Sequence, residues 1–228
     1  GDEQGLHIHG WKRLMEASGV SFRSQPNWSG SSNNQMDCQV DCGHGVPLWA
    51  YSPGEIRQVI RFSVDLLNHW GFSSNRHFRT GGWMGSTKVL EALVLEGFEL
   101  DSSAVPQKFL RQSQPIIHSW LKTIWPHTKT TSQPYLVNFP SSGEIFELPN
   151  NGCLADYMTG HMMYQVFLKN VRLWRKDKSR SVFISLGFHQ ETAKRYLYRV
   201  DEAIRLISQY EKRYKVPVEY IADPLQVL

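Results

Sequence analysis

The apolar and polar positions divide the chain into segments with a helical period and segments with a strand period. Residues 52–71 repeat apolar side chains at helical spacing. Ser52, Pro53 and Glu55 form a helix-start signal, and Gly71 a stop signal. Three more segments have the helical period: 86–96, 161–174 and 192–214. The last of these is predicted to turn the following side chains inward: Tyr196, Leu197, Val200, Ile204 and Ile207.

Short apolar runs between these helices predict strands. The runs are 6–9, 76–80, 98–101, 135–139, 145–148, 182–188 and 216–221. The run 182–188 is almost continuously apolar, which is typical of a strand buried on both faces. Strands that alternate with helices predict an α/β fold with a parallel sheet or barrel, whose active site lies at the carboxyl ends of the strands.

No internal repeat or long linker divides the sequence, which predicts a single domain over residues 1–228. Residues 20–51 are rich in Ser, Asn and Gly and have no sustained period, so they are expected to form an inserted loop. The content of 41% hydrophobic residues is that of a globular protein, and a net charge of +4 is too small to indicate nucleic-acid binding. No apolar run reaches the ~20 residues of a membrane span, and no signal-peptide pattern is visible.

The first chemical candidate is the pair His7 and His9. In a strand, residues two apart point to the same face, so both imidazoles project together while Ile8 points to the other face. Gly10 then ends the strand, which places the pair at a strand end. Two neutral imidazoles suit Zn²⁺ or a similar ion. The alternative is two polar side chains at a strand tip, held by hydrogen bonds and water.

Three further polar groups follow other predicted strands. Arg79 precedes two glycines and could orient a carboxylate. Asp101 could hold a His or an Arg, and His189 could act as a general acid or base. Each has a simpler explanation: a surface Arg, a turn, or a helix start. An alternating fold would bring all of these strand ends to one edge, so together they predict an active site.

The three cysteines leave several possibilities open. Cys38, Cys42 and His44 have the character of zinc ligands, but a fourth ligand is missing from the cluster. One disulfide bond and three free thiols are the other possibilities, with Cys153 distant in sequence.

Several of these motifs, in their order and approximate spacing, resemble the NodB-like polysaccharide deacetylases (carbohydrate esterase family 4). They are 5–11, 78–83, 96–98, 101–103 and 186–189. The resemblance covers nearly the whole chain. It implies a distorted (β/α) barrel, a divalent metal ion that is usually zinc, and hydrolysis of N-acetyl or O-acetyl groups on sugar polymers. The substrate would be an acetylated polysaccharide such as peptidoglycan, and the location the cell envelope.

The resemblance also implies roles for individual residues. His7 corresponds to the first metal ligand, and Arg79 to the Arg that orients the catalytic-base Asp. Asp101 lies in the motif 101–103, whose carboxylate supports the general acid in the family. His189 corresponds to that acid. Separately from these family roles, Trp83 lies in or near a loop and is expected to stack on the sugar, with ordinary packing as the alternative.

The family spaces its two metal-binding histidines by four, which would place the second at Trp11. His9 is therefore the expected second ligand, and His44 is the alternative. The family's Asp-Asp motif, with its first strand segment, would lie ahead of Gly1 in this numbering, and no Asp-Asp pair occurs in the chain.

Two other functions remain open. A catalytically silent relative would keep the barrel and bind carbohydrate without hydrolysing it. An amidohydrolase-type or phosphoesterase-type barrel also has a His-x-His motif at its first strand, but such enzymes need further His and Asp residues at later strand ends.

Overall fold

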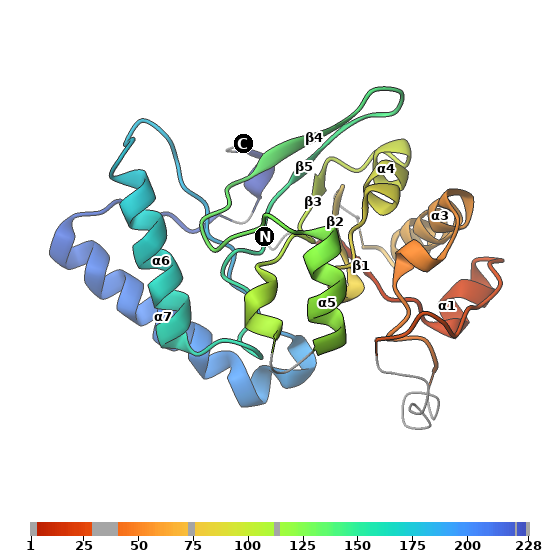
Figure 1. Cartoon of the computed structure of the whole chain (residues 1–228), viewed down its shortest axis with the longest axis horizontal. Coiled ribbons are helices and arrows are strands. Elements are labelled where there is room, and N and C mark those ends of the chain that lie inside the picture. Colours follow the sequence, from red (N-terminus) through yellow and green to blue (C-terminus); the bar gives the residue numbers. More distant parts are fainter. Residues whose placement is uncertain (1–3, 29–40, 73–75, 112–114, 222, 227–228) are drawn as a thin grey trace. The chain divides into compact units, whose positions relative to one another are not determined.

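The computed structural model describes residues 4–28, 41–72, 76–111, 115–221 and 223–226. Within these residues it contains six α-helices and one five-stranded sheet (Figure 1). The α/β class predicted from the sequence is confirmed. None of the described helices is both long enough and apolar enough to span a membrane.

The sheet has the strand order β1-β2-β3-β5-β4. Four strands are mutually parallel along this order: β1 (Leu6–Ile8), β2 (His77–Thr80), β3 (Leu100–Asp101) and β5 (Gly143–Glu147). The fifth, β4 (Tyr135–Phe139), is antiparallel to β5 and forms a hairpin with it (Figure 1). The parallel core confirms the predicted parallel sheet, whereas closure into a barrel stays a prediction.

Two compact units divide the chain. The first contains Gly1–Ser103, Ser119–Ile124 and Tyr135–Glu147, and therefore the whole sheet. The second contains Ala104–His118, Trp125–Pro134 and Leu148–Leu228. Helix α5 (Pro115–Ile124) contributes to both units.

The first unit also holds α1 (Lys12–Ala17), α3 (Pro53–His69) and α4 (Thr87–Leu95). The predicted start of α3 is confirmed, because the Ser52 hydroxyl accepts from the backbone of Glu55 while the Glu55 carboxylate accepts from the backbone of Ser52. The apolar stripe of α3 is buried, and Gly71 follows its end with a φ of +79°, a conformation that glycine adopts without strain.

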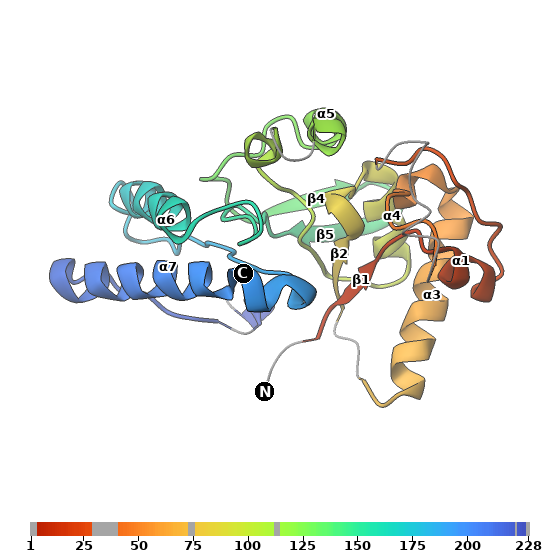
Figure 2. The ribbon, with the colours of Figure 1, turned by 90° about the horizontal axis from the view of Figure 1, so that it is seen from below.

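The second unit is built around α6 (Gly160–Trp174) and α7 (Ala193–Tyr214), which lie side by side (Figure 2). Their shared core is Phe167, Val171, Ile207 and Val216. The inward face predicted for α7 is partly wrong: Ala203 and Ile207 are buried, but Leu197 and Ile204 are exposed.

The predicted strand over 182–188 is absent from the structure. This segment is half-buried to exposed, and it makes one isolated bridge, between Leu154 and Gly187. Side-chain amides bond to part of its backbone: Phe183 N donates to Gln133 Oε1 (2.7 Å), and Ser185 N donates to Asn151 Oδ1 (3.0 Å). At Gly187 the backbone pairs with that of Cys153 and Ala155, but this pairing does not extend into a ladder. Side-chain amides from elsewhere in the second unit thus satisfy part of the backbone that a strand would pair.

The predicted strand over 216–221 is also absent. Lys215 adopts a left-handed conformation at the end of α7, after which Val216 packs into the helical core and Val218 packs against it. These two alternate side chains give the segment an apolar pattern without a strand.

Candidate functional site

His7 and His9 converge at the end of β1. Their Nε2 atoms lie 3.1 Å apart, and their rings meet edge to face at 4.9 Å. Leu6 and Ile8, which alternate with them, are buried. The period-two argument therefore placed the two imidazoles correctly on one side of the strand.

Backbone carbonyl groups fix the orientation of both rings. His7 Nδ1 lies 2.8 Å from the carbonyl oxygen of Arg79, and His9 Nδ1 lies 3.0 Å from that of His44. A carbonyl oxygen can only accept, so each Nδ1 carries a proton, and a neutral ring then has its lone pair at Nε2. Metal-binding histidines are held in this way by a hydrogen bond at their other nitrogen.

Two lone pairs at 3.1 Å repel each other unless a cation or a proton lies between them. Because a Zn–N bond is about 2.0–2.1 Å long, one ion can touch both nitrogens at this separation. The donor chemistry of the pair therefore fits a divalent ion. Within the described ranges, however, no group of three or more His, Cys, Asp or Glu side chains is arranged as a metal site.

His44 supports His9 by its backbone and its ring. The two rings stack at a centroid distance of 4.1 Å and an interplanar angle of 15°. A stacked ring covers the face of His9, whereas a ligand binds in the ring plane at Nε2. This geometry favours His9 over His44 as the partner of His7.

Gly81 makes room for His9. A Cβ atom at this position would lie 2.6 Å from both Cγ and Nδ1 of the His9 ring, closer than such atoms can approach. At the next position Gly82 has a φ of +62°, and a Cβ there would meet the Trp28 ring at 2.8 Å. The two glycines noted in the sequence thus serve close approach, to His9 and Trp28.

If His7 and His9 bind zinc, as the sequence predicts, Gly81→Ala should weaken that binding although it removes no ligand. The added methyl group must displace the His9 ring and with it the Nδ1 bond to His44. Changes to supporting groups of metal sites typically cost about 10–100-fold in affinity. Calorimetric zinc titration of the wild type and the variant measures this loss, and circular dichroism shows whether the variant is folded. Equal affinities in two folded proteins would reject this role of Gly81.

Arg79 links the ends of three strands. Its carbonyl holds His7 on one side, and on the other its guanidinium donates to the carbonyl oxygen and hydroxyl of Ser102, both at 2.9 Å. The parallel register explains this, because Arg79 pairs with His7 across β1 and β2, and Phe78 pairs with Asp101 across β2 and β3. His7, Arg79 and Asp101 therefore share one edge of the sheet, as predicted.

Asp101 is fully buried in a polar network. Its carboxylate accepts from the backbone (3.1 Å) and the hydroxyl (2.8 Å) of Ser103, and that hydroxyl accepts from Thr80. Glu147, its neighbour on β5, is also fully buried and bonds to the Asp101 carboxyl group. Two carboxyl groups can share such a bond only if one holds a proton. The sequence predicted the strand that carries Glu147 but missed the residue itself.

Burial raises the pKa of Asp101, and the hydrogen bonds from Glu147 and Ser103 and the charge of Arg79 only partly oppose this effect. A carboxyl group whose pKa is raised by folding stabilises the folded state at pH values below its unfolded pKa of ~3.9. This stabilisation is lost as the pH rises through the pKa of the folded state. We therefore expect the free energy of unfolding of the wild type, relative to Asp101→Asn, to fall between pH 4 and pH 8. Urea denaturation of both proteins at both pH values measures this difference in unfolding free energy. A difference that stays constant or rises with pH would contradict the shared proton.

His189 belongs to the second unit, just ahead of the 3-10 turn η4 (Gln190–Thr192). Its Nδ1 lies 3.2 Å from Oδ2 of Asp156, and Thr192 donates to Oδ1 of the same carboxylate at 2.6 Å. Burial raises the pKa of Asp156, but the bonds from Thr192 and His189 and the charge of His189 outweigh it and hold this pKa below its usual value. Asp156 is therefore an ionised partner for His189.

The sequence did not identify Asp156. It lies outside the described helices and strands, between Ala155 and Tyr157, with no motif around it. The role expected for Asp101, support of His189, remains a prediction because these residues belong to different units. Within the first unit the partners of Asp101 are Ser103 and Glu147.

Trp83 is only 5% exposed, and its φ of +60° follows from the tight turn at Gly81 and Gly82. This burial fits the packing role better than contact with a polymer. Cys42 is disulfide-bonded, and Cys153 is free and buried. Cys38, part of the alternative zinc cluster, lies outside the described residues.

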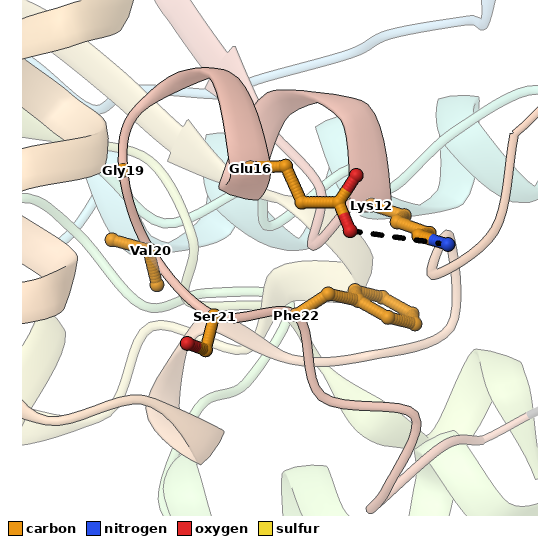
Figure 3. A pocket seen from close by; sticks show the side chains of 6 residues that line it. All are labelled: Lys12, Glu16, Gly19, Val20, Ser21 and Phe22. Atoms are coloured by element: carbon orange, nitrogen blue, oxygen red, sulfur yellow. Dashed lines mark ion pairs between the residues drawn. The ribbon is translucent and has the colours of Figure 1, made fainter.

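A cavity of about 490 Å³ lies beside α1, lined by Lys12, Glu16, Gly19, Val20, Ser21 and Phe22 (Figure 3). Its two charged lining residues form an ion pair at 3.8 Å. Their charges cancel, so this cavity offers no net charge to a ligand.

Comparisons of the chain with protein-family models, with curated proteins and with solved structures found no match. The geometry and the motifs are therefore the basis for the function proposed below.

Proposed function

We propose that this protein is a metal-dependent deacetylase of an acetylated polysaccharide. The observation that carries the proposal is the His7–His9 pair, whose Nε2 atoms lie 3.1 Å apart while both Nδ1 atoms bond to carbonyl oxygens. The resemblance of the motifs around these residues to NodB-like deacetylases supports the same function, and with it a distorted (β/α) barrel.

His7 and His9 would hold the ion, which we propose to be zinc. When bound, such an ion polarises an acetyl carbonyl group and makes water more acidic. Catalytic zinc sites usually have three protein ligands, and by resemblance to the family the third would be an Asp.

In the proposed reaction, the oxygen of water forms a bond to the acetyl carbon and the C–N bond breaks. The products are acetate and a free amine on the sugar. His189 supplies the proton that the leaving nitrogen needs, from Nε2, because its Nδ1 faces Asp156. By resemblance to the family, the base that takes the proton of water would be an Asp.

Arg79 and Asp101 act in this proposal as positioning residues. The Arg79 carbonyl orients His7, and its guanidinium fixes the backbone at Ser102. The buried network of Asp101 with Ser103 and Thr80 stiffens the same edge of the sheet. We infer an N-acetylated polymer of the cell envelope, such as peptidoglycan, as the substrate.

The proposal is tested by acetate release. Wild-type protein supplied with zinc is incubated with N-acetylglucosamine oligomers and, separately, with an O-acetylated glycan, and free acetate is measured alongside oligomer binding. Release from the N-acetylated oligomers is the expected result. Binding without release from either substrate would instead make the protein a carbohydrate-binding relative of these enzymes.

A further inference from the structure

A second cavity, of about 410 Å³, lies within the second unit. Three segments enclose it: the 3-10 helix η3 (Gln107–Leu110) with the residue before it, the loop 126–131, and one position on α6. The residues that line it are Pro106, Gln107, Lys108, Pro126, Thr128, Lys129, Thr130, Thr131 and Lys169.

The lining carries three positive charges and no negative one. Lys108, Lys129 and Lys169 come from the three different segments, and no Asp or Glu is among the described residues that line the cavity. In the part of the chain that the structure describes, none of these lysines forms an ion pair. Partial burial, and next the charge of Lys169, lower the pKa of Lys108, whose ammonium group lies 5.0 Å from the centre of the Phe109 ring.

Side-chain amides hold the walls of the cavity in place. Asn170, next to Lys169 on α6, is 1% exposed and donates to the carbonyl oxygen of Thr130 at 2.8 Å. Gln133 donates to Asn170 Oδ1 at 3.0 Å, and Gln107 donates to the carbonyl oxygen of Trp125 at 3.2 Å. The loop is thus tied to α6 on one side and to η3 on the other, so the lysines are brought together by the fold.

Threonine hydroxyls add neutral donors to this lining. Thr128, Thr130 and Thr131 all contribute to the cavity, and within the described ranges their hydroxyl groups take part in no hydrogen bond. Ammonium and hydroxyl groups around one cavity are the donors that bind anionic oxygen atoms.

We propose that this cavity is a binding site for a phosphate group, either as inorganic phosphate or carried by a sugar-sized molecule. Phosphate carries a charge of about −1.5 to −2 near neutral pH and several strong acceptor oxygens, so it can face three lysines where a carboxylate offers one charge. The volume of about 410 Å³ leaves room for an organic group beside the phosphate. This site is separate from the proposed deacetylase chemistry and does not depend on it.

The test is calorimetric titration of the whole chain with sodium phosphate, glucose 6-phosphate and glucose at constant ionic strength. Saturable binding of either phosphate compound, without binding of glucose, supports the proposal. If glucose 6-phosphate binds more tightly than phosphate, the rest of the cavity contacts the organic group. If the two affinities are equal, only the phosphate group is bound. Binding of neither compound overturns the proposal.

Variants locate the binding. Each of Lys129→Gln and Lys169→Gln should weaken it about tenfold, since each removes one charge-assisted bond. Lys212→Gln, a matched change at an exposed position on α7 outside the cavity, should leave the affinity unchanged. Full affinity in the Lys129→Gln/Lys169→Gln double variant, or an equal loss in Lys212→Gln, would show that phosphate binds elsewhere. These effects do not depend on whether acetate is released.

Discussion

Replacing His7 by Ala should remove the bound divalent ion and abolish acetate release. The substitution deletes one of two nitrogens that meet at 3.1 Å, and the remaining His9 is a single neutral ligand. Loss of a direct ligand should cost more than the ~10–100-fold that changes around a metal site typically cost. Elemental analysis of the purified protein after dialysis, together with the acetate assay, measures both losses.

The control for this change is His69→Ala, at an exposed position at the end of α3 in the same unit. It removes one imidazole and should alter neither metal content nor activity. Circular dichroism establishes that both variants are folded. Unchanged metal content in a folded His7→Ala protein would reject the metal site, and the His7–His9 contact would then be a hydrogen bond between a protonated and a neutral ring.

Replacing His189 by Ala should lower the rate of acetate release by about 10²–10⁴-fold, the usual contribution of a general acid. Binding of the oligomer should persist, because the proton transfer matters in the reaction and not in binding. Acetate release and oligomer affinity are measured on the same N-acetylglucosamine oligomer. Wild-type rates in the variant would exclude His189 from the reaction.

Asp156→Asn separates positioning from proton transfer. Asp156 is ionised and its Oδ2 lies 3.2 Å from His189 Nδ1, so it fixes the orientation of the ring and leaves Nε2 for the proton transfer. We expect the variant to lower the rate of acetate release and to leave the oligomer affinity unchanged, because the proton transfer matters in the reaction and not in binding. A folded variant with the wild-type rate would show that Asp156 does not position His189.

Elements with local signals were predictable from the sequence. The helix α3 carries its own start and stop residues, and its capping bonds form within four consecutive residues, Ser52 to Glu55. The segment 182–188 had an equally clear apolar pattern but no strand. Its backbone partners include the side chains of Gln133, Asn150 and Asn151, which are distant in sequence, and no local pattern predicts such bonds.

The candidate site also has features that the sequence could predict and features that it could not. The shared direction of His7 and His9 follows from the two-residue period of a strand, and the common edge of His7, Arg79 and Asp101 follows from a parallel register. The carbonyl groups of Arg79 and His44 that orient the imidazoles could not be predicted, because backbone acceptors have no sequence signature. Glu147 had a weak signal, since it shares a strand face with the buried Ile145.

Zinc dependence of acetate release tests the central claim most directly. The protein is treated with a chelator, dialysed and supplied with increasing zinc, and acetate release from N-acetylglucosamine oligomers is followed at each step. We predict that release stops after chelation and returns with added zinc until one ion is bound per chain. Release that persists in the metal-free protein, or oligomer binding without release at any zinc concentration, would contradict a metal-dependent deacetylase.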